Sequence, residues 1–123
     1  MIRLTNVGLK YDSGPDVLTD VTFHLRPGSF HFLHGESGAG KTSLLRLMFM
    51  SLHPSRGEIR MFNEDITAVK PQKRAQMRRR IGIVFQDFRL LDHLTVWENV
   101  ALPLQVLGKK PADYREDVTD LLQ

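Results

Sequence analysis

The sequence predicts an α/β fold, and three features of the chain indicate this class. Segments 2–11 and 21–25 alternate apolar and polar residues, as half-buried strands do. Segment 29–34 is a further predicted strand, which runs into a glycine-rich loop and then into large apolar residues at helical spacing. Segment 81–85 is apolar at successive positions, which is typical of a strand buried on both faces of a sheet. Strands separated by helices in this way define the α/β class.

The composition is that of one folded domain. The chain has 123 residues, of which 41% are hydrophobic and 25% charged, so it can bury a core and is not disordered. It has no cysteine, which excludes disulfides and thiolate metal sites and suits a reducing compartment. Its start lacks the apolar centre of a signal peptide, and no apolar run approaches the roughly 18 residues of a membrane span. We therefore expect a cytosolic protein that contacts a membrane only through a partner.

The segments after the glycine loop predict two helices separated by a short strand. The first helix begins at Thr42 and ends before Pro54, and the strand covers 58–62. The second helix starts at Pro71 and is polar and strongly basic. Proline is favoured at the first position of a helix, where its missing N–H costs nothing.

Two more helices are predicted in the last third of the chain. Thr95 and Glu98 have the spacing of a capping box, which starts a helix that runs through Val100 and that Pro103 interrupts. A final amphipathic helix begins at Pro111. Its apolar face consists of Tyr114, Val118, Leu121 and Leu122.

The glycine-rich loop carries the clearest functional pattern. Gly35, Gly40, Lys41 and Thr42 match the P-loop spacing GxxxxGK[ST] between a predicted strand and a predicted helix. Glycines let successive backbone N–H groups converge on one phosphate, and the helix N-terminus adds unpaired donors and partial positive charge. The lysine reaches the outer phosphates and the Thr42 hydroxyl can ligate Mg²⁺. A glycine turn that happens to precede Lys and Thr is the alternative, and the strand–loop–helix context favours phosphate binding.

Two residues outside this loop extend the pattern. Tyr11 follows the first predicted strand, 24 residues before the loop, and Gln86 ends the apolar segment 81–85. Together with the P-loop, and with segment 54–67, these positions resemble the nucleotide-binding domain of ABC transporters. Asn63 stands where that family commonly has glycine. The resemblance covers essentially the whole chain, from 1 to 123.

The resemblance implies a P-loop NTPase core of the ABC ATPase type, with an N-terminal antiparallel β-subdomain and the beginning of a helical subdomain. It implies that Tyr11 stacks on adenine and that Thr42 and Gln86 ligate Mg²⁺, so the cofactors expected are ATP and Mg²⁺. Tyr11 could otherwise be an ordinary half-exposed aromatic, and Gln86 a polar strand end. The ATP-binding residues expected are Tyr11, Gly35, Glu36, Ser37, Gly38, Ala39, Gly40, Lys41, Thr42 and Ser43.

Within the family, the pattern is most similar to ATPases of bacterial cell division, while lipoprotein-release and amino-acid-import ATPases share much of it. The resemblance implies an integral membrane partner, a homodimer in the full-length protein, and a peripheral position on the cytoplasmic face of the inner membrane. Segment 87–100 faces that partner in the family. Phe88, Leu90, Leu91 and Leu94 could equally be local core, which is favoured for any single one of them.

A run of basic residues invites a nucleic-acid interpretation, but no nucleic acid is expected as a partner. No aromatic residue is interleaved with these cations, so a solvated face or a patch near anionic lipid headgroups is favoured. The run consists of Lys70, Lys73, Arg74, Arg78, Arg79 and Arg80.

Hydrolysis in the family requires parts that this sequence lacks. They are a signature loop from the opposing copy, an apolar strand ending in Asp-Glu, and a later histidine at the γ-phosphate. Asp87 follows the apolar segment, but Gln86 intervenes. We therefore expect a truncated, N-terminal portion of an ATP hydrolase, in which no catalytic set is complete and which binds ATP without significant turnover. A nucleotide-dependent binding module remains an alternative, whereas a small-molecule kinase lacks candidate acceptor-site residues.

Overall fold

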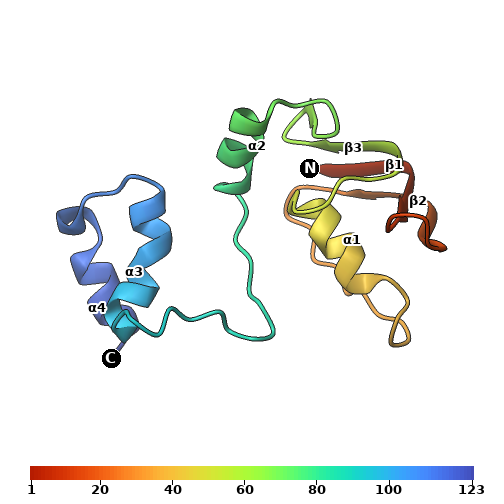
Figure 1. Cartoon of the computed structure of the whole chain (residues 1–123). Helices are drawn as coiled ribbons and strands as arrows, with labels where there is room; N and C mark the ends of the chain where they lie inside the picture. The colour runs from red at the N-terminus through yellow and green to blue at the C-terminus, as the bar shows by residue number, and fades with distance from the viewer. The chain divides into compact units, whose positions relative to one another are not determined.

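The computed structural model describes all residues from 1 to 123, which form two compact units, Met1–Arg78 and Arg79–Gln123. The first unit contains a four-stranded antiparallel sheet and two helices, and the second is helical (Figure 1). None of the helices combines the length and the apolar character that crossing a bilayer requires.

The sheet of the first unit has the strand order β2-β1-β3-β4. Its strands are β1 (Ile2–Lys10), β2 (Asp16–Leu25), β3 (Arg56–Met61) and β4 (Glu64–Asp65). Leu4 of the central strand β1 lies opposite Phe23 of β2 and Ile59 of β3. The alternation read in segments 2–11 and 21–25, and the short strand at 58–62, are thereby confirmed.

Two helices accompany this sheet, and both were predicted. Helix α1 (Lys41–Met48) follows the glycine loop and buries Leu44 and Leu47, and helix α2 (Pro71–Arg78) buries Met77. The side chains buried almost completely come from the sheet and from α1, and they are Leu4, Val7, Leu47, Ile59 and Met61. At about 25 cal/mol per Å² of apolar surface removed from water, their burial is the main stabilising term of this unit.

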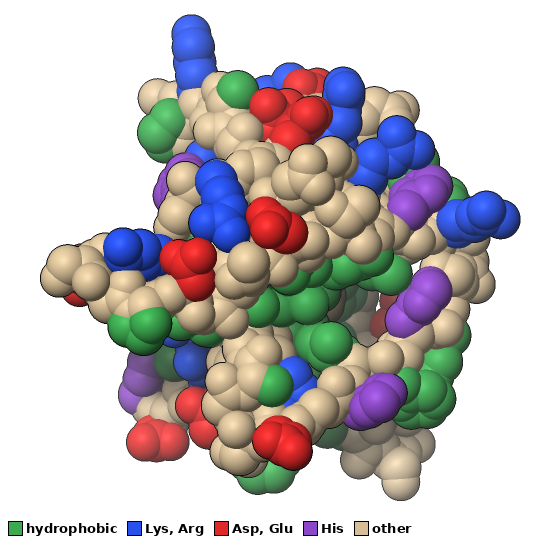
Figure 2. Space-filling view, turned by 90° about the vertical axis from the view of Figure 1, so that its right-hand side faces the viewer, with side chains coloured by type: hydrophobic (Ala, Val, Ile, Leu, Met, Phe, Trp, Pro, Cys, Tyr) green, Lys and Arg blue, Asp and Glu red, His purple; other side chains and the backbone are tan.

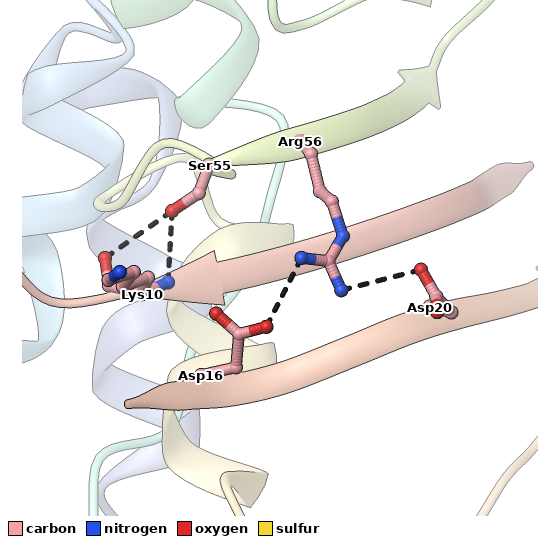
Figure 3. A network of polar contacts seen from close by, with 5 residues as sticks. All are labelled: Lys10, Asp16, Asp20, Ser55 and Arg56. Carbon is pink, nitrogen blue, oxygen red and sulfur yellow. Dashed lines mark hydrogen bonds and ion pairs between the residues drawn. The ribbon is translucent and has the colours of Figure 1, made fainter. Parts of the chain in front are cut away.

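An arginine on β3 ties the three long strands together across the surface of the sheet (Figure 3). Because β1 lies between β3 and β2, the Arg56 side chain crosses β1 to reach Asp16 at 3.1 Å and Asp20 at 3.4 Å. Gly8 of β1 lies beneath it, and a Cβ there would stand 2.8 Å from the Arg56 side chain. The absence of a side chain at position 8 therefore gives the arginine its path.

A second contact fixes the end of β1. The Ser55 hydroxyl accepts a hydrogen bond from the Lys10 backbone N–H at 2.9 Å and lies 3.3 Å from the Lys10 carbonyl oxygen (Figure 3). Exposed ion pairs and hydrogen bonds of this kind contribute roughly 1 kcal/mol or less each. Their effect here is positional, because they hold the ends of β1 and β2 between which Tyr11 lies.

Two predicted strands are wrong. Segments 29–34 and 81–85 form no strand, and neither pairs with a neighbouring one. Phe30 and Phe32 are more than 80% exposed, and Val84 is 99% exposed. A strand is stable only where a neighbour satisfies its backbone groups and covers its apolar face, and this chain supplies no such neighbour to either segment.

Apolar surface also remains open beside β2 and α1. A hollow of about 450 Å³ is lined by segment 31–33, by the second half of β2 and by α1, and most of the lining residues are apolar. Figure 2 shows hydrophobic side chains exposed around a hollow on the face it presents.

The second unit is built from α3 (Val96–Val106), the 3₁₀ turn η1 (Pro111–Asp113) and α4 (Arg115–Leu121). Its core consists of Ala101, Tyr114 and Val118, against which Trp97, Val100 and Leu104 pack. The rings of Trp97 and Tyr114 lie 6.0 Å apart between centroids. All of these contacts lie between α3 and the segment from η1 to α4, so the second unit has a hydrophobic core of its own.

The predicted interruption at Pro103 is wrong, because α3 continues through it to Val106. The last turn is closed by hydrogen bonds from Leu107 to the Pro103 carbonyl and from Gly108 to the Gln105 carbonyl. Proline removes one intrahelical bond, and packing of the neighbouring Ala101 and Leu104 against α4 offsets that loss.

The predicted apolar face of the last segment is only partly buried. Tyr114 and Val118 are buried, whereas Leu121 is 75% exposed and Leu122 is exposed as well. The assignment of Phe88, Leu90 and Leu91 to local core is wrong, because all three side chains are exposed, whereas Leu94 is half-buried. Instead, the loop backbone is held by the Asn99 side chain, which binds the Leu91 N–H at 2.8 Å and the Leu91 carbonyl at 3.1 Å.

The predicted capping box is confirmed, and it makes a testable contribution to the second unit. The Thr95 hydroxyl accepts from the Glu98 N–H, and the Glu98 carboxylate accepts from the Thr95 N–H at 2.7 Å. The backbone and hydroxyl donors of Thr95 hold the pKa of Glu98 below its usual value. We expect Thr95→Ala to destabilise α3 by about 1 kcal/mol at pH 7, measured from urea unfolding followed by Trp97 fluorescence.

Because the pKa of Glu98 is lowered by folding, its contribution is present above its unfolded pKa and is lost as pH falls through the folded pKa. The difference between Thr95→Ala and the unsubstituted chain should therefore shrink at acid pH. Thr19→Ala, at an exposed position of β2, is the control and should unfold like the unsubstituted chain. Equal unfolding midpoints for Thr95→Ala and the unsubstituted chain at pH 7 would show that the cap does not stabilise the unit.

Candidate functional site

The glycine loop joins segment 29–34 to α1 and lies against β2. Gly40 is the N-cap of α1 and has φ +87°, in the left-handed region that favours glycine. A Cβ on Gly40 would stand 2.8 Å from Leu18 Cδ2 and 3.0 Å from the Val17 carbonyl oxygen. The loop can therefore turn into the helix at this distance from β2 only with glycine at position 40.

The start of α1 presents unpaired backbone donors. The first amide bonded within the helix is that of Leu44, which donates to the Gly40 carbonyl at 2.8 Å. The N–H groups of Lys41, Thr42 and Ser43 precede it and have no helical acceptor. With the partial positive charge of the helix N-terminus, these donors favour an anion in front of them.

Lys41 brings a full positive charge to the same place. Its ammonium Nζ donates to the Gly35 carbonyl at 2.8 Å and to the Glu36 carbonyl at 2.6 Å, so the side chain folds back over the loop. Beside it lies an open hollow of about 250 Å³ lined by Val17, Ser37, Gly38, Gly40, Lys41, Thr42 and Ser43. The loop thus combines backbone donors, an ammonium group and three hydroxyls around one hollow, which is a donor set suited to phosphate oxygens.

The structure brings Tyr11 to this loop. The Tyr11 hydroxyl lies 3.0 Å from the Ser43 hydroxyl, although 32 residues separate them in sequence. Tyr11 is 41% exposed, which leaves part of the residue open to a ligand. Gln86 is exposed and belongs to the second unit, so its predicted role at the metal stays a prediction.

Several residues that position the site were missed from the sequence. Val17 and Leu18 support Gly40, and Arg56 ties β3 to the two strands that flank Tyr11. The Arg56 ion pairs join residues 40 and 36 positions apart in sequence, and no local pattern indicates such pairs. The register of β1 with β3 would have been needed to find them.

A glycine loop with a lysine folded over it, leading into a helix N-terminus, defines a P-loop nucleotide-binding protein. Comparison with known families narrows this class. The family described as "ABC transporter" matches residues 18–123, and the chain belongs to it. This match confirms the resemblance to ABC transporter nucleotide-binding domains that was drawn from Tyr11, the loop and Gln86. Proteins of this family are ATPases.

Among curated proteins, the cell division ATP-binding protein FtsE of Escherichia coli (strain K12) is 43% identical over 122 residues, and that of Bacillus subtilis (strain 168) is 36% identical. These matches cover 99% of this chain but 55% and 54% of the relatives. The methionine import ATP-binding protein MetN of Aliivibrio fischeri is 37% identical over 125 residues, covering 99% of this chain and 36% of that protein. The chain spans about half the length of the FtsE relatives.

Solved structures agree with this assignment and confirm the predicted fold class. The ATP-binding cassette MJ0796, in a dimeric post-hydrolysis state bound to ADP and Pi, has a TM-score of 0.86 and 30% identity, covering 98% of this chain and 55% of that one. A second dimeric structure of MJ0796, described as a bacterial ABC transporter cassette, has a TM-score of 0.79 and 34% identity, with coverage of 85% and 47%.

Proposed function

We propose that this chain is the ATP-binding portion of an FtsE-type subunit, which acts in bacterial cell division with an integral membrane partner of the FtsX type. The observation that carries the proposal is the arrangement of the loop, in which Lys41 Nζ lies at the Gly35 and Glu36 carbonyls beside the free amides of α1. The names of the FtsE relatives favour this subfamily.

Different residues are proposed to bind the phosphates, the Mg²⁺ ion and the base of the nucleotide. The amides at the start of α1 and the Lys41 ammonium hold phosphate oxygens by charge-assisted hydrogen bonds. Mg²⁺, when bound, neutralises phosphate charge, and the Thr42 hydroxyl and the Gln86 amide oxygen are the groups proposed to hold it. Tyr11 is proposed to stack on adenine. The remaining loop residues, Glu36, Ser37, Gly38 and Ala39, shape the backbone around the phosphates.

The proposal extends to assembly. Dimeric cassettes among the structural relatives support a homodimer of nucleotide-binding domains in the full-length protein. We propose further that this dimer is held peripherally at the cytoplasmic face of the inner membrane, through the membrane partner. The 123-residue chain alone is proposed to bind Mg-ATP without significant turnover, since it encodes neither the signature loop nor the Asp-Glu strand end expected for hydrolysis. The full-length protein is proposed to hydrolyse ATP.

A second candidate function is the ATP-binding subunit of an amino-acid importer, which the 37% identity to a methionine import protein supports. The membrane partner distinguishes the two. We would co-express the full-length subunit with the FtsX-type and the methionine-permease-type proteins of its source and measure which one it retains through purification. Retention of the FtsX-type protein alone supports the proposal, retention of the permease supports the second candidate, and retention of neither contradicts both.

Replacing Tyr11 tests the proposed stacking on the base. An aromatic stacking contact is worth on the order of 1 kcal/mol, so Tyr11→Ala should weaken ATP binding about fivefold. Tyr11→Trp keeps a stacking surface and should bind ATP more tightly than Tyr11→Ala. Calorimetric titration of both variants measures this, and equal weakening would show that Tyr11 does not stack.

A further inference from the structure

The turn that carries Tyr11 is held at both of its ends by two consecutive residues at the start of β3. This turn lies between Lys10, the last residue of β1, and Asp16, the first residue of β2. The Ser55 hydroxyl bonds the backbone N–H and carbonyl of Lys10, at 2.9 and 3.3 Å. The next residue, Arg56, pairs with Asp16 at 3.1 Å (Figure 3).

Backbone pairing alone does not fix the place of this turn. The pairing of β1 with β2 shifts register between Leu9 and Lys10, and the pairing of β1 with β3 ends at Gly8. A register shift interrupts the ladder of hydrogen bonds and bends the strand locally. The side chains of Ser55 and Arg56 therefore hold the end of β1 where the ladder is irregular.

Gly8 lets Arg56 reach both carboxylates on β2. A Cβ at position 8 would stand 2.8 Å from Cγ and Nε of Arg56, so any side chain there would displace the arginine. The guanidinium crosses β1 and places one nitrogen at Asp16 and the other at Asp20. A planar guanidinium serves two carboxylates at once, whereas a lysine ammonium is a point charge on a flexible stem.

We infer that Arg56 is a positioning residue for base binding, which, together with Ser55, holds the turn so that the Tyr11 ring is in place for the nucleotide base. The inference rests on the proposed stacking of Tyr11 and names a residue on which that stacking depends. Its physical basis is preorganisation, because a ring already held where the base binds loses less freedom when the base stacks on it. Since Arg56 acts through Tyr11, its loss should affect ligands that have a base and spare those that have only phosphates.

The test measures the ratio of the affinity for Mg-ATP to that for magnesium tripolyphosphate, by calorimetric titration of the 123-residue chain and its variants. The ratio is used because loss of a charge near the loop changes both affinities alike. Arg56→Ala should lower it about threefold, which is within the range that exposed ion pairs contribute. Arg56→Lys, which keeps the charge and one ion pair, should lower it less.

Gly8→Ala tests the same contact with every charge kept. Its Cβ displaces the Arg56 side chain, and the Gly8 backbone lies outside the left-handed region, so alanine causes no strain there. It should therefore lower the ratio as Arg56→Ala does. Should Arg56→Ala lose its fold, which circular dichroism checks, Gly8→Ala decides the matter.

Two further comparisons separate positioning from a general effect. Arg60→Ala removes an arginine from the same strand, where it pairs with Glu58 at 3.5 Å, and should leave the ratio unchanged. Tyr11→Ala should lower the ratio about fivefold. In a chain that already carries Tyr11→Ala, Arg56→Ala should lower it no further, because both act through the same ring.

Three results would overturn the inference while the proposed stacking stands. They are an unchanged ratio in Arg56→Ala and Gly8→Ala, an equal fall in Arg60→Ala, and a further fall when Arg56→Ala is added to Tyr11→Ala. If the unsubstituted chain binds neither ligand, or if Tyr11→Ala itself leaves the ratio unchanged, the proposed function of this site fails and the inference fails with it.

Discussion

Lys41→Ala should abolish binding of Mg-ATP while leaving the fold intact. The Lys41 ammonium hydrogen-bonds the loop carbonyls of Glu36 and Gly35 at 2.6 and 2.8 Å, and it is placed to reach phosphate oxygens instead. A charge-assisted hydrogen bond is worth about 1.5–3 kcal/mol, and the loss of two of them lowers affinity by at least about a hundredfold. Calorimetric titration with Mg-ATP measures the affinity.

The matched control for this substitution is Lys70→Ala, which removes the same charge at an exposed position just before α2. It should bind Mg-ATP like the unsubstituted chain, because its charge lies outside the loop. Circular dichroism of both variants checks that they are folded. A folded Lys41→Ala variant with unchanged affinity would remove the claim that this loop binds phosphate.

Gly40→Ala should destabilise the first unit and weaken ATP binding together. Alanine at φ +87° incurs about 1–2 kcal/mol of backbone strain, and its Cβ would stand 2.8 Å from Leu18 Cδ2 and 3.0 Å from the Val17 carbonyl oxygen. Relieving these contacts requires the loop or β2 to shift, at a further cost of roughly 1–3 kcal/mol. Urea unfolding measures the stability, and titration with Mg-ATP measures the affinity.

Gly38→Ala separates these two effects. Gly38 has φ +82°, so alanine there has similar backbone strain, but nothing lies within 4 Å of its added Cβ. We expect Gly40→Ala to be the less stable of the two variants. Equal unfolding free energies would mean that packing of the loop against β2 does not matter.

The parts of the fold that were predicted correctly depend on local signals. The capping box of Thr95 and Glu98 spans four residues, and Pro71 marks the start of α2, so each can be read without knowing the tertiary structure. Segments 29–34 and 81–85 have the composition of strands, but pairing depends on a partner strand, and the described chain contains none for them. The interruption of α3 at Pro103 was predicted from the properties of proline alone. The helix continues because Ala101 and Leu104 pack in the core of the second unit, and this packing cannot be read from the local sequence.

The candidate site shows the same division. The loop 35–43 is contiguous, so its pattern alone predicts where Lys41 and the helix start lie. The role of Tyr11 came from resemblance, and its place beside Ser43 depends on how the turn after β1 meets α1. No sequence pattern contains that contact, nor the path of Arg56 over Gly8 that holds the strands around it.

The central claim is that residues 35–43 bind the phosphates of ATP, with Tyr11 at the base. The most direct measurement is a titration of the isotope-labelled 123-residue chain with Mg-ATP and with magnesium tripolyphosphate, followed by the backbone amide resonances. The account predicts that both ligands shift the amides of 35–43, and that only ATP also shifts those around Tyr11. Shifts confined to other parts of the chain, or none at ligand concentrations of several millimolar, would contradict it.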